Sequence, residues 1–442
     1  MGVAAKIRGA AIAAYLDRGP RVARQWHRFR RAVTRGPRVV TFYHQVDDPY
    51  SHLLVQALRP VVARCDIRLR PVLVPPPAAD ADPEPDKRLA FALRDAAELS
   101  EHLTVDFPRG ASAPPADRVR RVNAVLLRER PVSEWIEVAA QLGGALWRDD
   151  GDALAAMVRQ HGTVSGQSVR PALEANYRAL RKAGHYMGAM LEYGGEWYWG
   201  IDRLAYLVAR LVAEGASEVF EPVVERDAPF PPAPLSEGRV AVEVFFSFRS
   251  PYSYLAVERL RQLRDELPID LSLRPLLPMV TRGLAVPRDK VRYITRDAKR
   301  EADRLGIPLG RICDPLGEGV ARCVAVFLQV ERARGPRMAH DFAAAALQGI
   351  WSRAIDVATD RGLGEVARAA GVEDCVAAGL AARGWEATVD RHRVALAELG
   401  LWGVPSFRLG DWSTWGQDRL WLLERRVRAA CAEPAAAGAS TV

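Results

Sequence analysis

The sequence predicts an α/β protein built from two domains of similar architecture. Its 442 residues exceed the length at which one hydrophobic core usually stops growing, so two domains are expected. Short stretches rich in β-forming residues alternate with longer amphipathic stretches, which indicates mixed strands and helices. Motifs also recur in the same order in both halves, and such recurrence indicates an internal repeat.

The repeat begins where residues 40–53 align without gaps on residues 242–255 and share Pro-Tyr-Ser. Four further pairs of motifs keep the same order along the chain, and chance similarity rarely preserves so many anchors. They are Leu-Arg-Pro at 69–71 and 273–275, Arg-Asp-Ala at 94–96 and 296–298, Trp147 with Asp152 and Trp351 with Asp356, and residues 199–204 with 415–420. We therefore interpret the chain as a diverged tandem duplication.

The second copy shows the expected elements most clearly. Residues 242–248 are rich in β-formers, and residues 269–275 alternate apolar with polar side chains, so both predict strands. The Ala-rich region 289–399 predicts helices. Residues 407–409 and 414–415 flank Gly410 and Asp411 as a hairpin, and residues 418–429 predict a closing amphipathic helix.

These patterns set the expected domain limits. We predict a basic helical extension over 1–38, a first domain over 39–214, a Pro-rich linker over 215–240, a second domain over 241–430 and a flexible tail over 431–442. The extension carries ten Lys and Arg residues against the single acid Asp17. A solvated basic helix is the simpler interpretation, and docking to an acidic surface or membrane is the alternative.

Composition restricts the function classes. No apolar run approaches the ~18 residues of a membrane span, so we expect no integral membrane segment. We attribute the net charge of +8 to heavy Arg usage and expect no nucleic-acid partner. The five cysteines include no C-x-x-C pair, so neither a disulfide framework nor a metal site is predicted, and a cytoplasmic location follows as the simplest expectation.

The second copy resembles the DsbA-like thioredoxin superfamily, and within it the branch of 2-hydroxychromene-2-carboxylate isomerases and kappa-class glutathione transferases. Four motifs carry this resemblance: Ser-Pro-Tyr-Ser-Tyr-Leu at 250–255, the basic-aromatic segment 290–297, Trp351 with Asp356, and Gly-Val-Pro-Ser at 403–406 followed by Trp-Gly-Gln-Asp-Arg at 415–419. It implies two thioredoxin-like domains, each with an inserted helical subdomain.

The resemblance places a glutathione site at Ser250. Redox members of the superfamily carry C-x-x-C at the start of the first helix, where the helix dipole stabilises a thiolate. This chain has Ser-Pro-Tyr-Ser there, so dithiol exchange at this position is excluded. The Ser250 hydroxyl would instead donate a hydrogen bond to the glutathione sulfur. The dipole of the following helix would stabilise the thiolate by a further ~0.3–1 kcal/mol. Ser followed by Pro is also an ordinary start of a helix.

Four further residues complete the implied site. Pro405 is expected to be cis, with the Val404 backbone facing the cysteinyl part of glutathione. Asp418, with Gln417 beside it, is expected to bind the γ-glutamyl ammonium. Asp418 could equally be a structural acid at a helix start or a partner of Arg419.

The chain departs from the family at the segment after the second strand. Related enzymes have an Asn-Arg-Pro-Pro-like sequence there, whereas this chain has residues 279–287 without Asn, and neither Thr281 nor Arg282 reproduces an amide. Lys290, Arg292 and Tyr293 could line the site entrance or form a solvated helix face. Trp402, Trp412 and Trp415 could form an aromatic pocket or simply pack.

The first copy lacks the implied site. Asp48 stands at the position of Ser250, where a carboxylate would repel a thiolate, and Ala189 stands at the position of Pro405, where a trans bond is expected. We expect this copy to serve structure, packing as a pseudo-dimer with copy two, or partner docking.

The predicted function is a glutathione-dependent isomerase or transferase. Its substrate is expected to be a small aromatic or electrophilic molecule, with carboxylates among the candidates. A dimer of the whole chain, beyond the pseudo-dimer of the two copies, is a further candidate. The alternative is a catalytically silent tandem thioredoxin-like protein that acts as a binding scaffold. A dithiol oxidoreductase ranks third because the required cysteines are absent.

Overall fold

The structure is a computed structural model that describes residues 3–218, 220, 239–284 and 286–431. The chain divides into two compact units. The C-terminal unit comprises the described parts of 1–19, 227–285 and 294–442, and the N-terminal unit those of 20–226 and 286–293. Most of the predicted linker and nearly all of the predicted tail lie outside the described residues.

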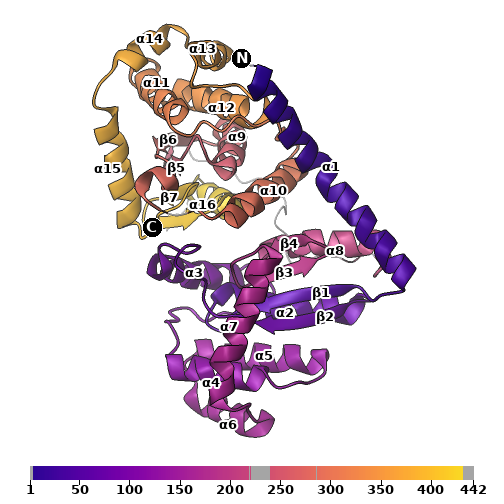
Figure 1. Cartoon of the computed structure of the whole chain (residues 1–442). Helices are drawn as coiled ribbons and strands as arrows, with labels where there is room; N and C mark the ends of the chain where they lie inside the picture. Colours follow the sequence, from indigo (N-terminus) through magenta and orange to yellow (C-terminus); the bar gives the residue numbers. More distant parts are fainter. Residues whose placement is uncertain (1–2, 219, 221–238, 285, 432–442) are drawn as a thin grey trace, which may run out of the picture. The chain divides into compact units, whose positions relative to one another are not determined.

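The C-terminal unit is built on a four-stranded sheet in the order β6-β5-β7-β8. Figure 1 labels three of these strands, β5, β6 and β7. Strand β5 (Val240–Phe246) pairs in parallel with β6 (Ile269–Pro275), and antiparallel with β7 (Ser406–Leu409), which forms a hairpin with β8 (Trp412–Trp415). The second half of β5 is mostly buried, at Val242, Val244, Phe245 and Phe246, as expected for a central strand covered on both faces.

Helices surround this sheet and carry most of the core. Phe246 and Phe248 contact Phe327, and Phe248 also contacts Phe342, so the end of β5 packs on two helices of the insertion. The elements are α9 (Pro251–Glu266), η2 (Met279–Arg282), α10 (Arg288–Leu305), α11 (Glu318–Arg334), α12 (Pro336–Ser352), α13 (Asp360–Ala369), α14 (Asp374–Ala381), α15 (Trp385–Glu398), η3 (Gln417–Arg419) and α16 (Leu420–Cys431).

The N-terminal unit repeats the same sheet order, β2-β1-β3-β4. Strand β1 (Val39–His44) is parallel to β2 (Arg68–Leu73) and antiparallel to β3 (Met190–Tyr193), which forms a hairpin with β4 (Glu196–Trp199). Its helices are the second half of α1 (Val3–Thr34), from residue 20 on, and α2 (Pro49–Arg64), α3 (Pro85–Ser100), α4 (Ala116–Leu126), α5 (Val132–Trp147), α6 (Gly151–His161), α7 (Gly166–Ala183), η1 (Ile201–Arg203) and α8 (Leu204–Ala213).

Each unit makes the same internal hydrogen bonds at matching positions. Tyr50 donates to Asp95 over 2.8 Å, and Tyr252 donates to Asp297 over 2.7 Å. The amide of Gln45 donates to Ser51 Oγ, and that of Ser247 donates to Ser253 Oγ, each over 3.2 Å. The aligned sequence motifs therefore occupy equivalent places in two sheets of the same order.

Two assignments of chain to unit differ from the predicted limits. Leu16 of α1 is buried in the core of the C-terminal unit, whereas His27 of the same helix contacts Tyr193 of the N-terminal unit. The start of α10 belongs to the N-terminal unit, where Tyr293 packs on His185. These contacts join residues far apart in sequence, which local patterns do not reveal.

No helix among the described residues is long and apolar enough to cross a membrane. All five cysteines are free, and four of them are buried. Burial raises the pKa of the Cys323 thiol, so this thiol stays protonated and inert.

Candidate functional site

Ser250 lies where the chain leaves β5 and enters α9. It is the residue before the helix, with extended backbone angles, and Pro251 occupies the first helical position. The amide of Ser253 donates to Ser250 Oγ over 3.1 Å. Ser250 is therefore the N-terminal cap of α9. The hydroxyl proton makes no hydrogen bond with another described residue, and the side chain is only partly buried.

The Val404–Pro405 bond is cis, as expected. Phe245 pairs with Ser406, so the antiparallel register places Val404 and Pro405 beside the end of β5, from which the chain turns toward Ser250. Val404 is partly exposed, and its backbone groups form no hydrogen bond with the described residues. An unpaired backbone donor and acceptor are thus available at this end of the sheet.

Gln417 and Asp418 reach the same end through β8. The amide of Gly416 donates to the Pro405 carbonyl over 2.8 Å, which ties η3 to the cis-proline turn. The buried Gln417 side chain donates to Asp418 Oδ1 over 2.6 Å and to the buried Glu301 Oε2 over 3.1 Å. Gln417 therefore positions the partly exposed Asp418 carboxylate, and ligand contact by either residue stays a prediction.

Arg282 occupies the segment in which the family's Asn is missing. The 3-10 helix η2 follows β6, whose last residue Pro275 pairs with Phe246, so η2 also lies at this end of the sheet. The Arg282 guanidinium donates to the Trp402 carbonyl over 3.0 Å. Thr281 instead bonds the Pro278 carbonyl locally. Arg282 thus supports the turn that contains Val404, a contact that the sequence did not reveal.

The tryptophans near the turn pack against it. The Trp402 and Trp415 rings are 4.7 Å apart, and a Cβ placed on Gly403 would lie 2.5 Å from Trp415 Nε1. Arg426 stacks over the ring of Trp412 instead. Of the two interpretations of this cluster, packing is the one these contacts support.

The comparisons with known proteins concern the C-terminal unit. The model of the DsbA-like thioredoxin domain matches residues 241–428. This segment is a DsbA-like thioredoxin domain.

A relative of the DsbA-like domain is the 2-hydroxychromene-2-carboxylate isomerase of Sphingobium xenophagum. It is 26% identical over 194 residues, which cover 41% of this chain and 95% of that protein. A solved structure of a 2-hydroxychromene-2-carboxylate isomerase has 25% identity, covers 43% of this chain and 96% of its own, and has a TM-score of 0.38. The structure of the cytosolic disulfide reductase DsbM from Pseudomonas aeruginosa is 18% identical to this chain, with a TM-score of 0.34. The match covers 43% of this chain and 100% of DsbM.

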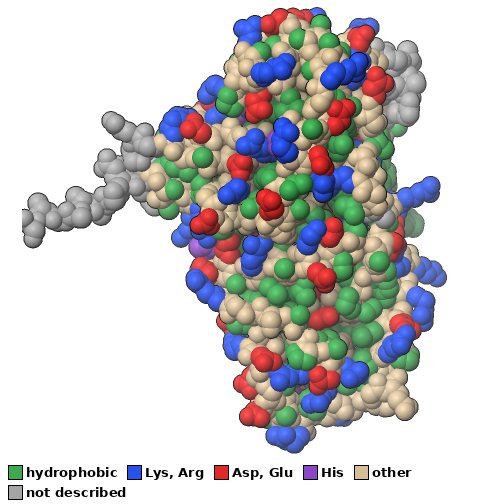
Figure 2. All heavy atoms as spheres, turned by 90° about the vertical axis from the view of Figure 1, so that its left-hand side faces the viewer, with side chains coloured by type: hydrophobic (Ala, Val, Ile, Leu, Met, Phe, Trp, Pro, Cys, Tyr) green, Lys and Arg blue, Asp and Glu red, His purple; other side chains and the backbone are tan. Residues whose placement is uncertain are grey.

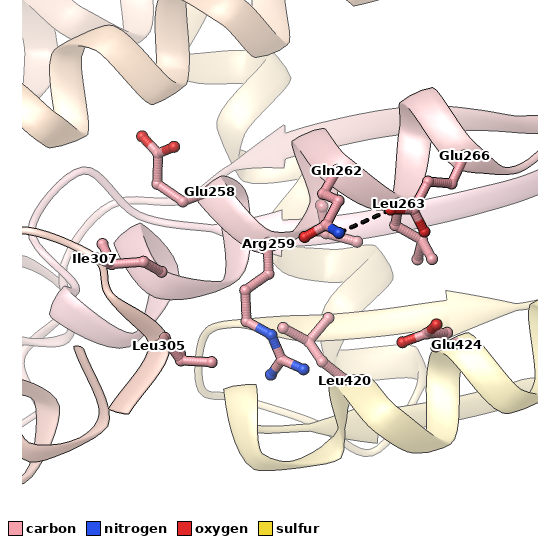
Figure 3. A pocket seen from close by; sticks show the side chains of 10 residues that line it. Glu258, Arg259, Gln262, Leu263, Glu266, Leu305, Ile307, Leu420 and Glu424 are labelled. Atoms are coloured by element: carbon pink, nitrogen blue, oxygen red, sulfur yellow. Dashed lines mark hydrogen bonds between the residues drawn. The ribbon is translucent and has the colours of Figure 1, made fainter. Parts of the chain in front are cut away.

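The DsbA-like domain also has a concave pocket that sequence reasoning missed (Figure 3). It has a volume of about 360 Å³ and lies between α9, the end of α10 and α16. Figure 3 shows Arg259 reaching down from α9 toward Leu420, and its guanidinium lies 3.4 Å from the Gln417 carbonyl. None of Ser250, Val404 and Asp418 lines this pocket, although Arg259 connects it to Gln417 of the predicted site.

Lys290 and Tyr293 belong to the N-terminal unit. Lys290 donates to the Ala81 carbonyl over 3.2 Å and stacks over Tyr186, and burial lowers the pKa of its ammonium group. The alternative of a wholly solvated face is therefore wrong for these two side chains, although Arg292 is exposed. Among the described residues no cluster of acids, histidines and cysteines could hold a metal ion.

The N-terminal unit fills the equivalent of the Ser250 position with its own charges. Asp48 caps α2 by accepting from the amide and hydroxyl of Ser51, both over 2.9 Å. Arg88 lies 3.8 Å from Asp48 and 2.5 Å from Asp82. Burial raises the pKa of the Asp48 carboxyl. Ala189, which follows a trans bond, donates its amide to Ser51 Oγ.

Proposed function

We propose that the DsbA-like domain is a glutathione-dependent isomerase or transferase of the 2-hydroxychromene-2-carboxylate isomerase type. One observation carries the proposal: Ser250, the Val404–Pro405 turn and Asp418 reach the same end of one sheet through β5, β7 and β8. The sequence relationship to an isomerase over 95% of that protein's length supports it as well.

Ser250 has the chemistry needed to hold a thiolate. Its Oγ already accepts the Ser253 amide, so its proton is left to donate outward. It lies at the start of the 16-residue helix α9, whose dipole favours negative charge there. Both effects lower the pKa of a thiol brought to this position. Since the protein offers no cysteine here, the thiol must arrive on a small molecule.

The remaining groups fit the peptide-like part of glutathione. The unpaired N–H and C=O of Val404 match a backbone-like amide of the ligand. The Asp418 carboxylate, oriented by Gln417, is a partner for an ammonium group. Arg282 holds the Trp402 carbonyl and thereby keeps the turn in place rather than replacing the amide of the missing Asn.

When bound, glutathione supplies the thiolate that adds reversibly to an electrophilic carbon of the substrate. In this proposal the Ser250 hydroxyl donates a hydrogen bond to the glutathione sulfur. The Val404 backbone and Asp418 orient the peptide part of glutathione. The substrate class follows from the relationship: a small aromatic or otherwise electrophilic molecule, with hydroxychromene carboxylate as the first to test.

Calorimetric titration with glutathione tests the proposal. The wild-type chain should bind, and Ser250→Thr should bind comparably because it keeps a hydroxyl. Ser250→Gly should bind roughly ten-fold more weakly or worse, although it costs the helix cap only a few tenths of a kcal/mol. Absence of binding by the wild type, or equal binding by Ser250→Gly, would refute the site.

A second candidate is a catalytically silent scaffold. The observation that favours it for the N-terminal unit is the pairing of Arg88 with the buried carboxylates of Asp48 and Asp82, which leaves no hydroxyl donor at the equivalent position. We infer that this unit is a diverged duplicate that has lost glutathione binding. The matched Tyr50–Asp95 and Tyr252–Asp297 contacts support the common origin.

A further inference from the structure

Residues 20–34 of α1 carry a row of exposed apolar side chains. Val22, Trp26, Phe29 and Val33 are 61%, 63%, 59% and 67% exposed. Their separations of four, three and four positions place them on one face of the helix, and the Trp26 and Phe29 rings stack 5.7 Å apart. We name these four residues the apolar stripe. Exposed aromatic and aliphatic residues gathered in this way mark an interaction surface.

The opposite face of the helix fastens it to the N-terminal unit. Arg24 donates to Glu196 over 2.8 Å, the His27 ring lies 4.9 Å from that of Tyr193, and Arg31 lies 4.0 Å from Glu214. Polar residues thus face the protein and apolar residues face outward, the reverse of an ordinary surface helix. These contacts fix the orientation of the helix, so the apolar stripe points away from its own unit and stays exposed.

The charges beside the apolar stripe have a single sign. Arg21, Arg28 and Arg30 are exposed, and Asp17 is the only acid in the first 38 residues. On the molecular face drawn in Figure 2, by contrast, basic and acidic side chains are interspersed. If a second copy of the chain docked on the apolar stripe, its arginines would lie against these arginines, and like charges would repel. An anionic surface would pair with them instead.

We propose that residues 20–34 dock on the surface of an anionic lipid bilayer. The apolar stripe enters the boundary between headgroups and acyl chains, and the flanking arginines contact lipid phosphates. The helix lies in the interface and does not span it, consistent with the finding that no described helix can cross a membrane. Trp26 suits this depth because its ring is apolar while its N–H can remain hydrated.

Sedimentation of the full-length chain with vesicles tests the proposal. The wild type should bind mixed phosphatidylcholine–phosphatidylglycerol vesicles and bind pure phosphatidylcholine vesicles far less. Trp26→Ser with Phe29→Ser should reduce the partition coefficient roughly ten-fold or more. The matched control, Leu316→Ser with Val394→Ser, removes exposed apolar side chains elsewhere and should leave binding unchanged.

The charge contribution is tested separately. Arg21→Gln, Arg28→Gln and Arg30→Gln should each weaken binding to the anionic vesicles roughly five-fold, and added salt should act in the same direction. Failure to bind either vesicle, or equal binding to both, would overturn the proposal. So would a concentration-dependent dimer that the Trp26→Ser, Phe29→Ser variant loses in ultracentrifugation, because the occupant would then be a second copy.

Discussion

Tyr252 donates a hydrogen bond to the buried carboxylate of Asp297, and Tyr50 makes the same contact with Asp95 in the other unit. Each bond joins the first turn of a helix that follows a central strand to the helix that begins the insertion. In the DsbA-like domain it lies two residues beyond Ser250. It therefore links the candidate site to the rest of the domain.

Tyr252→Phe should destabilise the chain by about 1–3 kcal/mol, because it leaves the buried Asp297 with fewer donors. Arg300 remains 3.2 Å from that carboxylate and limits the loss. The free energy of unfolding in urea provides the measurement, with Tyr50→Phe as the matched substitution in the other unit. Unchanged stability of Tyr252→Phe would show that this bond contributes nothing.

Gly403→Ala should disturb the cis-proline turn. The added Cβ would lie 2.5 Å from Trp415 Nε1, and Trp402 packs on the same ring, so the indole has little freedom to move. We expect a loss of about 1–3 kcal/mol and altered tryptophan fluorescence. Gly364→Ala is the control: it lies in α13 with open space at its Cβ, and it should be neutral or stabilising. Equal effects of the two substitutions would contradict the account.

Asp418→Asn should weaken glutathione binding roughly ten-fold, since the side chain loses the charge that pairs with the γ-glutamyl ammonium. Binding of N-acetylcysteine, which lacks that ammonium, should change little. Calorimetry with both thiols measures the difference, and Asp411→Asn, an exposed acid in the adjacent turn, serves as the control. Equal losses for both thiols would assign Asp418 a structural role.

His340 should make the stability of the chain sensitive to acid. Its ring is buried with Nε2 3.0 Å from the Val257 carbonyl, and burial lowers its pKa from the ordinary 6.5 to about 4. The unfolded chain therefore binds a proton that the folded chain refuses. Stability contributed by the neutral ring is full above pH 6.5 and falls as the pH drops toward about 4.

His340→Gln removes this titration while keeping a donor for the carbonyl. Urea unfolding between pH 7 and 4, followed by circular dichroism, should show a shallower pH dependence for the variant than for the wild type. Parallel curves would mean that His340 does not titrate as its burial implies.

Local patterns predicted the strands because each carries its own signal. The alternation of apolar and polar side chains gave strand β6 with its observed limits, Ile269–Pro275, and the β-forming run gave β5 to within two residues. The motif comparison placed Ser250 at a helix start and Pro405 before β7. These features depend on neighbours in sequence and on resemblance.

The supporting contacts could not be predicted, because they join distant parts of the chain. Arg282 and Trp402 are 120 residues apart, and Gln417 and Glu301 are 116 apart. No periodicity records such pairs. Lys290 likewise bonds Ala81, which is 209 residues away. From the sequence alone, the start of this helix could therefore be interpreted either as lining the site entrance or as a solvated face.

The ultraviolet absorbance of the thiolate, followed across pH while glutathione is bound, tests the role of Ser250 most directly. The account predicts that the pKa of the bound thiol lies about one unit or more below that of free glutathione. It predicts that Ser250→Thr retains this shift and that Ser250→Gly loses most of it. A bound thiol that titrates like free glutathione, or an equal shift in Ser250→Gly, would contradict the assignment of Ser250 as the thiolate donor.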